Sequence, residues 1–239
     1  MDTHARTGKL LAGYDRMAQA VRLRLLDRYH PKHVWEIVAE TRREFATLIP
    51  AIPRLDENHV WQFNLDTSAV DLALYRTMRR WSFSPAEAVQ MIYDAFAAYV
   101  QSLALPLRLA YRWYYFTPLH QDRLRRGAAA SQLRRHPADW VFTYVEGDGR
   151  AFDVGVDVTE CAIEKFYRAQ GAAELTPYLC ALDHAMGKLL GLGFTRTGTL
   201  ASGAAVCDCR WKHGAETPGW PPVFVSPVTL SQPGGVSTL

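Results

Sequence analysis

The spacing of the apolar residues changes at Trp140, and this change is the strongest constraint on how the 239-residue chain can fold. Before Trp140, apolar side chains recur at helical spacing between prolines. After it, residues 140–145 are β-branched and aromatic, residues 146–149 form a turn, and residues 152–158 alternate apolar with polar or small side chains. The pattern therefore predicts helices first and a β-hairpin afterwards.

Residues 1–135 are predicted to be a helical region. Its clearest local signal is Ser84-Pro85-Ala86-Glu87, a capping box with proline at the first helical position, which begins a helix that continues to about Leu103. The aromatic run at residues 111–116 is expected to be buried packing, because no RNA-binding strand motif accompanies it. Helical spacing predicts further helices over residues 9–29, 34–49, 67–81 and 118–135.

The last third of the chain adds two helices and a second hairpin. The order strand-strand-helix-helix-strand-strand indicates an α+β fold, in which a ββααββ unit with a four-stranded antiparallel sheet follows the N-terminal helical segment. We expect residues 136–212 to be this α+β region, sharing one core with the helices, and residues 213–239 to be an irregular tail rich in proline and glycine. The predicted helices span residues 160–170 and 175–190, and the second hairpin pairs residues 194–200 with 204–211 across Ser202-Gly203.

Composition and motifs argue against several classes of function. The net charge of +3 is too small to indicate a nucleic-acid surface, and no run of ~18 apolar residues suits a membrane span. No signal peptide is visible, so we expect a cytoplasmic protein. Without a Walker loop, GxGxxG, HExxH or GxSxG motif, nothing supports nucleotide hydrolysis or hydride transfer, and no cofactor is expected. The helices carry enough apolar surface for a homodimer, although one core could equally absorb it.

Side chains that could perform chemistry are concentrated between Val158 and Arg210. Cys180, Asp183 and His184 share one helix face through their i, i+3 and i+4 spacing. On such a face an imidazole could deprotonate the thiol, and the carboxylate could orient either group. Each of these residues taken alone is more often explained by core packing or by a solvated helix surface than by a functional role.

The predicted last strand contributes four more candidates. Cys207 and Cys209 alternate with Asp208 and Arg210, so the two pairs face opposite sides of the sheet. One pair therefore faces the core and the other faces the second side of the sheet.

Cys161 and Glu164 share a face of the helix predicted to follow the first hairpin. A thiol at the beginning of a helix has its pKa lowered by the helix dipole. A zinc site formed by the cysteines and His184 would lack the CxxC spacing of zinc knuckles, so no metal site is expected.

These candidates belong to an ordered series of short motifs that resembles the L-2-amino-thiazoline-4-carboxylic acid hydrolase family between about Trp140 and Trp211. The chain departs from the expected pattern at Cys209, where an aromatic residue would stand, and this departure concerns the substrate more than the fold. The strand order is also similar to that of vinyl-reductase-type ligand-binding domains, which are not catalysts. The series consists of Cys161-Ala162-Ile163-Glu164-Lys165-Phe166-Tyr167, Gly171, Glu174-Leu175, Cys180, Asp183, the run from Phe194 to Gly203, and Cys207-Asp208-Cys209-Arg210.

The resemblance implies a hydrolase acting on a non-peptide carbon–nitrogen bond, which opens a small nitrogen heterocycle bearing a carboxylate. Water adds to an amidine-like ring carbon, the ring carbon–sulfur bond breaks, and an N-carbamoyl amino acid forms. This chemistry needs a nucleophile or base, an acid for the leaving atom and a cation for the substrate carboxylate.

Roles can be assigned from these needs. A thiol would be the nucleophile, a carboxylate the general base or orienting acid, and a guanidinium the clamp for the substrate carboxylate. The thiol is Cys180 or Cys207, with Cys161 as a further candidate; the carboxylates are Asp183 and Asp208; the clamp is Arg196 or Arg210; Glu164 and His184 are further substrate-binding candidates.

Two other functions stay open. One is an enzyme of the same fold that forms or opens a related ring in specialised metabolism. The other is a noncatalytic module that holds a small apolar or tetrapyrrole ligand, with residues 111–116 lining its pocket.

Overall fold

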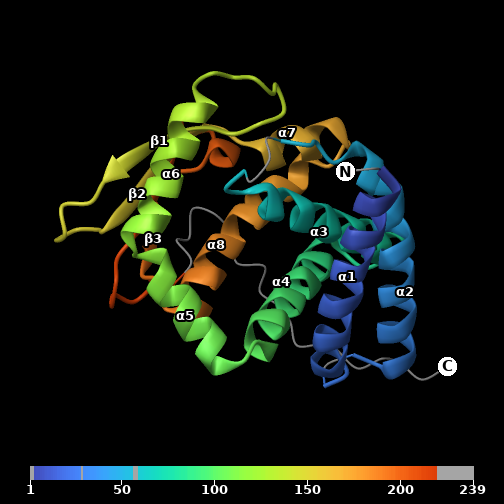
Figure 1. The fold of residues 1–239 in the computed structure, drawn as a ribbon. Coiled ribbons are helices and arrows are strands. Elements are labelled where there is room, and N and C mark those ends of the chain that lie inside the picture. The colour runs from blue at the N-terminus through green and yellow to red at the C-terminus, as the bar shows by residue number, and fades with distance from the viewer. Residues whose placement is uncertain (1–2, 28, 56–58, 220–239) are drawn as a thin grey trace.

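The computed structural model describes residues 3–27, 29–55 and 59–219, and it places a helical first part beside a four-stranded sheet (Figure 1). The order of elements confirms the predicted α+β class and the ββααββ unit. The helices are α1 (Thr3–Leu25), α2 (Pro31–Leu48), α3 (Gln62–Arg80), α4 (Pro85–Ser102), α5 (Leu105–Tyr115), α6 (Pro118–Ser131), α7 (Ala162–Ala169) and α8 (Thr176–Leu190). The strands are β1 (Val141–Glu146), β2 (Val154–Glu160), β3 (Phe194–Thr195) and β4 (Cys207–Trp211), and short 3-10 helices are η1 (Ile49–Ala51), η2 (Ala173–Leu175) and η3 (Leu200–Ser202).

The sheet is antiparallel in the order β1-β2-β4-β3. Tyr144 pairs with Val156, and Val156 pairs with Cys209, so these side chains share one face. Asp157 pairs with Asp208 on the other face. The alternation of buried and half-buried residues along β4 confirms that Cys207 and Cys209 face the protein interior while Asp208 and Arg210 do not.

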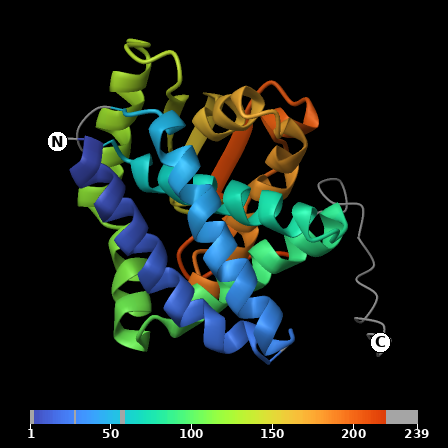
Figure 2. The ribbon, with the colours of Figure 1, turned by 90° about the vertical axis from the view of Figure 1, so that its right-hand side faces the viewer.

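The helices pack in layers against one face of this sheet. In the view of Figure 2, α1 and α2 lie in front, and the strands lie toward the back of the molecule. Helix α2 packs on α3, α1 packs on α4, α4 packs on α8, and α8 reaches β3. Helix α8 therefore connects the helical part to the sheet.

Buried side chains from the helices and from the sheet form a common core cluster. Phe45 of α2 and Phe142 of β1 are among its largest members, with 1% and 0% of their surface exposed. Tyr167 of α7 is fully buried, and its hydroxyl donates a 2.7 Å hydrogen bond to the Ser68 carbonyl of α3. This bond satisfies a polar group that would otherwise be costly to bury.

The second hairpin is shorter than predicted. Its strands are β3 and β4, and the residues between them include a 3-10 turn in place of extended strand. The reason is local hydrogen bonding: Thr199 and Ser202 cap η3 reciprocally, and Asp208 accepts hydrogen bonds from the backbone N–H groups of Thr197 and Gly198.

The prediction that residues 111–116 are buried packing is wrong for the beginning of the run, while Tyr114 and Phe116 are half-buried. Residues 111–116 lie on α5 and its end, where Tyr115 is buried but Tyr111 and Trp113 are 41% and 72% exposed. Only one side of α5 contacts the protein, so aromatic composition alone overstated its burial.

The predicted irregular tail falls mostly outside the described residues. Within residues 213–219, the chain has no helix or strand, and Thr217 is buried, accepting a 2.9 Å hydrogen bond from the Phe194 backbone N–H. Among the described residues, none of the helices combines the length and apolar character needed to cross a membrane.

Substitution Ser84→Ala is expected to lower the free energy of unfolding by about 1 kcal/mol. The Ser84 hydroxyl accepts from the Glu87 N–H, and the Glu87 carboxylate accepts a 2.7 Å bond from the Ser84 N–H, as the sequence predicts. Ser84 is exposed, so its truncation leaves no cavity. Urea denaturation measures the loss, with Ser102→Ala at the other end of α4 as a control that should change stability less.

Candidate active site

A cavity of about 200 Å³ lies between α1, α2, α3, α4, α7 and α8. Its wall is mainly apolar, and two acidic residues line it, Asp71 from α3 and Asp183 from α8. Phe63 and Asn64 are exposed and mark its rim. Within the described part of the chain, the residues that line it include no lysine or arginine.

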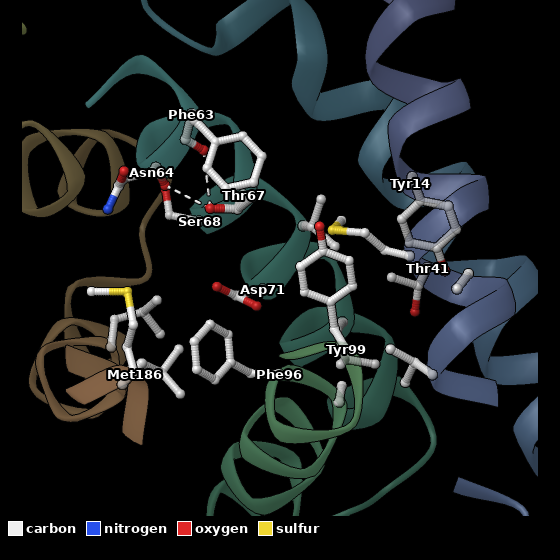
Figure 3. Close-up of a pocket in the computed structure, with 18 of the residues that line it drawn as sticks. Tyr14, Thr41, Phe63, Asn64, Thr67, Ser68, Asp71, Phe96, Tyr99 and Met186 are labelled. Atoms are coloured by element: carbon white, nitrogen blue, oxygen red, sulfur yellow. Dashed lines mark hydrogen bonds between the residues drawn. The ribbon is translucent and has the colours of Figure 1, made fainter. Parts of the chain in front are cut away.

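Asp71 lies in the middle of this cavity, between Phe96 and Tyr99 (Figure 3). Burial raises the pKa of its carboxyl group from 3.8 to about 7. A carboxyl group with this pKa exchanges its proton near neutral pH, which suits a general acid or base.

Asp183 is held by a buried arginine. Arg196 Nη1 donates a 2.8 Å hydrogen bond to Asp183 Oδ2, and the Arg196 side chain is 2% exposed. Arg196 Nη2 donates a 2.5 Å bond to the Cys180 carbonyl, so the guanidinium is fixed against α8. Burial raises the pKa of Asp183, and Arg196 opposes this shift. Asp183 also lines the cavity, and 40% of its side chain is accessible.

Arg196 keeps its charge in the interior. Burial is the largest single effect and lowers its pKa, but Asp183 together with the Cys209, Cys180 and Cys207 thiols outweighs burial, and the net effect is to raise the pKa. The structure places Arg196 beside Asp183, so the guanidinium pairs with a protein carboxylate and is not among the described residues that line the cavity.

Three of the four cysteines, Cys180, Cys207 and Cys209, lie near this ion pair. Cys207 and Cys209 are buried, Cys161 and Cys180 are half-buried, and none of the four is among the residues that line the cavity in the described chain. Burial raises the pKa of the Cys180, Cys207 and Cys209 thiols, with Arg196 opposing each shift. The thiols are therefore protonated at neutral pH.

Cys161 departs from the prediction made for it. It is the N-cap residue of α7, and the backbone N–H groups of Ile163 and Glu164 lower its pKa as expected. Burial is the larger effect and raises the pKa of Cys161 to about 11. The expected activation by a helix N-terminus is thus wrong here. Glu164 lies one turn along α7 in an ion pair with Arg168.

His184 packs away from the cavity. Its ring meets Phe194 edge-on with centroids 4.9 Å apart, and the residue is 3% exposed. Burial, and then the charge of Arg196, lower the pKa of His184 to about 4, against the opposing effect of the Pro218 backbone. So weak a base does not deprotonate the Cys180 thiol, although both occupy α8.

Asp208 and Arg210 lie on the other face of the sheet, away from the cavity. Arg210 forms a 2.8 Å ion pair with Asp157 and donates a 3.1 Å bond to the Val156 carbonyl. Asp208 accepts hydrogen bonds from the Thr197 hydroxyl and backbone, which lower its pKa against the effect of burial. The structure therefore separates this pair from Asp183 and Arg196.

The sequence did not single out Asp71. It belongs with Asn64, Thr67 and Ser68 to a polar stripe on α3 at positions i, i+3, i+4 and i+7. Such a stripe normally faces solvent, and here it faces the cavity because α1, α4 and α8 cover it. Metal ligation finds no support in the described residues, where no group of three His, Cys, Asp or Glu side chains could hold an ion.

Comparison with known families gives one result. A family model described as L-2-amino-thiazoline-4-carboxylic acid hydrolase matches residues 62–211, more than half of the chain. The chain belongs to this family. Searches of curated proteins and of solved structures found no match. The matched residues contain both cavity carboxylates and Arg196, whereas α1 and α2 precede the match.

Asp71→Asn is expected to stabilise the protein at pH 8 and to change its stability little at pH 4. The pKa of Asp71 is about 7 when folded and near 4 in an unfolded chain. Between these values the folded state retains a proton that the unfolded state has lost, so Asp71 reduces stability as pH rises. Urea denaturation of both proteins at both pH values tests this, and an equal difference at pH 4 and pH 8 would contradict it.

Asp183→Ala is expected to destabilise the protein by about 3 kcal/mol, because it leaves the buried Arg196 charge without its carboxylate. Glu146→Ala is the matched control, since it removes the partner of Arg125 in an exposed ion pair. The free energy of unfolding should fall much less in Glu146→Ala, because water screens the remaining Arg125 charge. Thermal and urea unfolding of both variants give the comparison, and equal losses would show that the Asp183 pair is not buried in solution.

Proposed function

We propose that the chain is a hydrolase that opens a 2-amino-thiazoline-4-carboxylate-like ring, with Asp71 as general base. The observation that carries this proposal is the pair of carboxylates, Asp71 and Asp183, in one largely apolar cavity within the family-matched residues. The family name supplies the reaction class, and the cavity supplies the groups that such a reaction needs.

Asp183 is proposed to bind the amidine part of the ring. A protonated cyclic amidine is a planar cation, and a carboxylate pairs with it through charge-assisted hydrogen bonds. Arg196 fixes the Asp183 carboxylate at 2.8 Å, so Arg196 is a positioning residue in this mechanism and not the clamp for the substrate carboxylate.

Asp71 is proposed to activate water. The ionised Asp71 takes a proton as the water oxygen bonds to the ring carbon between nitrogen and sulfur. The carbon–sulfur bond then breaks, and the sulfur accepts the proton from Asp71 as it leaves. The new hydroxyl becomes the urea carbonyl and gives its proton to solvent, which balances the charge of the protonated amidine. One water is consumed, the product is an N-carbamoyl amino acid with a free thiol, and Asp71 returns to its starting state.

The remaining candidates receive supporting roles in this proposal. Cys180 and Cys207 would have to lose protons that burial retains, so we assign them to packing around Arg196. We assign Asp208 to holding the loop that follows Arg196. We assign Arg210 to stabilising the sheet through its ion pair with Asp157. Cys161 and Glu164 are assigned to the structure of α7, and His184 to the contact between α8 and β3.

Turnover of 2-amino-thiazoline-4-carboxylate, followed by mass spectrometry, tests the proposal. Asp71→Asn should lower kcat/KM by about a hundredfold or more, the usual contribution of a general base. In the wild type, kcat/KM should rise with pH through about 7, because Asp71 acts in its ionised form. Asp66→Asn is the matched control on α3, because Asp66 pairs with Arg6 and does not line the cavity.

The same assay distinguishes the thiol mechanism. Cys180→Ala and Cys207→Ala should retain most of the activity if these residues only pack. Loss of turnover in the folded cysteine variants, together with activity in Asp71→Asn, would overturn the assignment of Asp71 and favour a thiol nucleophile.

A noncatalytic ligand-binding module is the second candidate, and the largely apolar cavity wall favours it. Residues 111–116, predicted to line such a pocket, are not among the described residues that line the cavity. Tight binding of small cyclic amidines without ring opening would support this alternative.

A further inference from the structure

Part of the cavity wall comes from outside the family match. Helices α1 and α2 precede residue 62, where the match begins. They close one side of the cavity, so this side is a property of the present chain that the family match does not describe. The lining residues on these helices are Tyr14, Met17, Ala18, Val21, Leu25, Ile37, Val38 and Thr41.

This α1–α2 wall, defined by those eight residues, offers a ligand mainly apolar surface. Of its two hydroxyl groups, that of Tyr14 donates a 2.7 Å bond to the Val38 carbonyl, whereas the buried Thr41 Oγ1 has no hydrogen-bond partner among the described residues. Val21 and Ile37 are 7% and 3% exposed. A ligand group against this wall would gain mainly from leaving water.

The wall lies across the cavity from α8. Figure 3 shows Asp71 in the middle, with Tyr14 and Thr41 on one side and Met186 on the other. Asp183 comes from α8, on the same side as Met186. A ligand whose cation meets Asp183 and whose reacting carbon meets Asp71 would therefore direct its remaining substituent toward α1 and α2.

We propose that the substrate is a cyclic amidine with an apolar substituent, and that this substituent binds against the α1–α2 wall. The inference rests on the proposed function, because it uses Asp183 and Asp71 to orient the ring. The proposed substrate differs from 2-amino-thiazoline-4-carboxylate, because the substituent on that ring is an anion. The charged groups that line the cavity in the described chain are carboxylates, and carboxylates repel an anion.

The size of the cavity limits the substituent. An apolar cavity of about 150 Å³ accommodates benzene. The cavity of about 200 Å³ therefore suits a five-membered ring with a small branched alkyl group better than a large aromatic system. An isobutyl group at ring position 4, in place of the carboxylate, is the test substituent.

Isothermal titration of the full chain with three probes tests the preference. The probes are 2-amino-2-thiazoline, its 4-isobutyl derivative and its 4-carboxylate derivative. The isobutyl probe should bind about tenfold or more tighter than either of the others, since it alone buries apolar surface on α1 and α2. Equal affinity for all three probes, or tightest binding of the carboxylate, would overturn the inference.

Substitutions in the α1–α2 wall test whether the substituent binds there. Ala18→Leu places a larger side chain in the wall and should weaken binding of the isobutyl probe about tenfold while leaving 2-amino-2-thiazoline unaffected. Ala12→Leu, at an exposed position of the same helix, is the control and should change neither affinity. Met17→Ala removes apolar contact without overpacking the wall, so it should also weaken binding of the isobutyl probe alone. This variant replaces Ala18→Leu as the test if Ala18→Leu does not fold.

Failure of this inference is distinguishable from failure of the proposed function. Ring opening of 2-amino-thiazoline-4-carboxylate, with isobutyl binding insensitive to Ala18→Leu and Met17→Ala, would keep the hydrolase and overturn the apolar substituent. Tight isobutyl binding that both variants weaken, without ring opening of any probe, would keep the binding mode and overturn the hydrolase.

Discussion

The ion pair between Arg196 and Asp183 is the interaction on which the arrangement of the site depends. A guanidinium that is 2% exposed is tolerated because one donor binds a carboxylate and another binds the Cys180 carbonyl. These two bonds fix the segment after β3 against α8, and they hold Asp183 at the cavity. The buried cysteines around the pair provide small apolar packing that keeps water from the guanidinium, so the pair is part of the core and of the site at once.

The sequence predicted most of the fold because apolar periodicity reports burial directly. The change of spacing at Trp140 and the capping box at Ser84 both correspond to elements of the structure. The order of motifs placed Asp183 and Arg196 among the candidate residues, but it did not predict that they form an ion pair. The sequence did not predict Asp71, because a carboxylate facing a cavity and one facing solvent follow the same spacing along a helix. The exposure of Trp113 escaped prediction for a related reason, since composition does not say which helix remains uncovered.

The cavity is lined by two parts of the chain, one inside and one outside the family match. The carboxylates and the residues that hold them lie within the family-matched region, and part of the apolar wall lies on α1 and α2 before it. Such a division allows the reacting groups to stay fixed while the surface that selects the substrate changes with the flanking helices. The packing of α1 on α4 and of α2 on α3 brings that variable surface to the cavity.

Asp71 also couples the cavity to the proton concentration of its surroundings. With a pKa of about 7, the carboxyl group is divided between its two protonation states at neutral pH. A cation that enters the cavity stabilises the ionised state and releases the proton to the buffer. Uptake of a positive ligand is therefore an exchange of one cation for another, and its measured heat includes the ionisation heat of whichever buffer receives the proton.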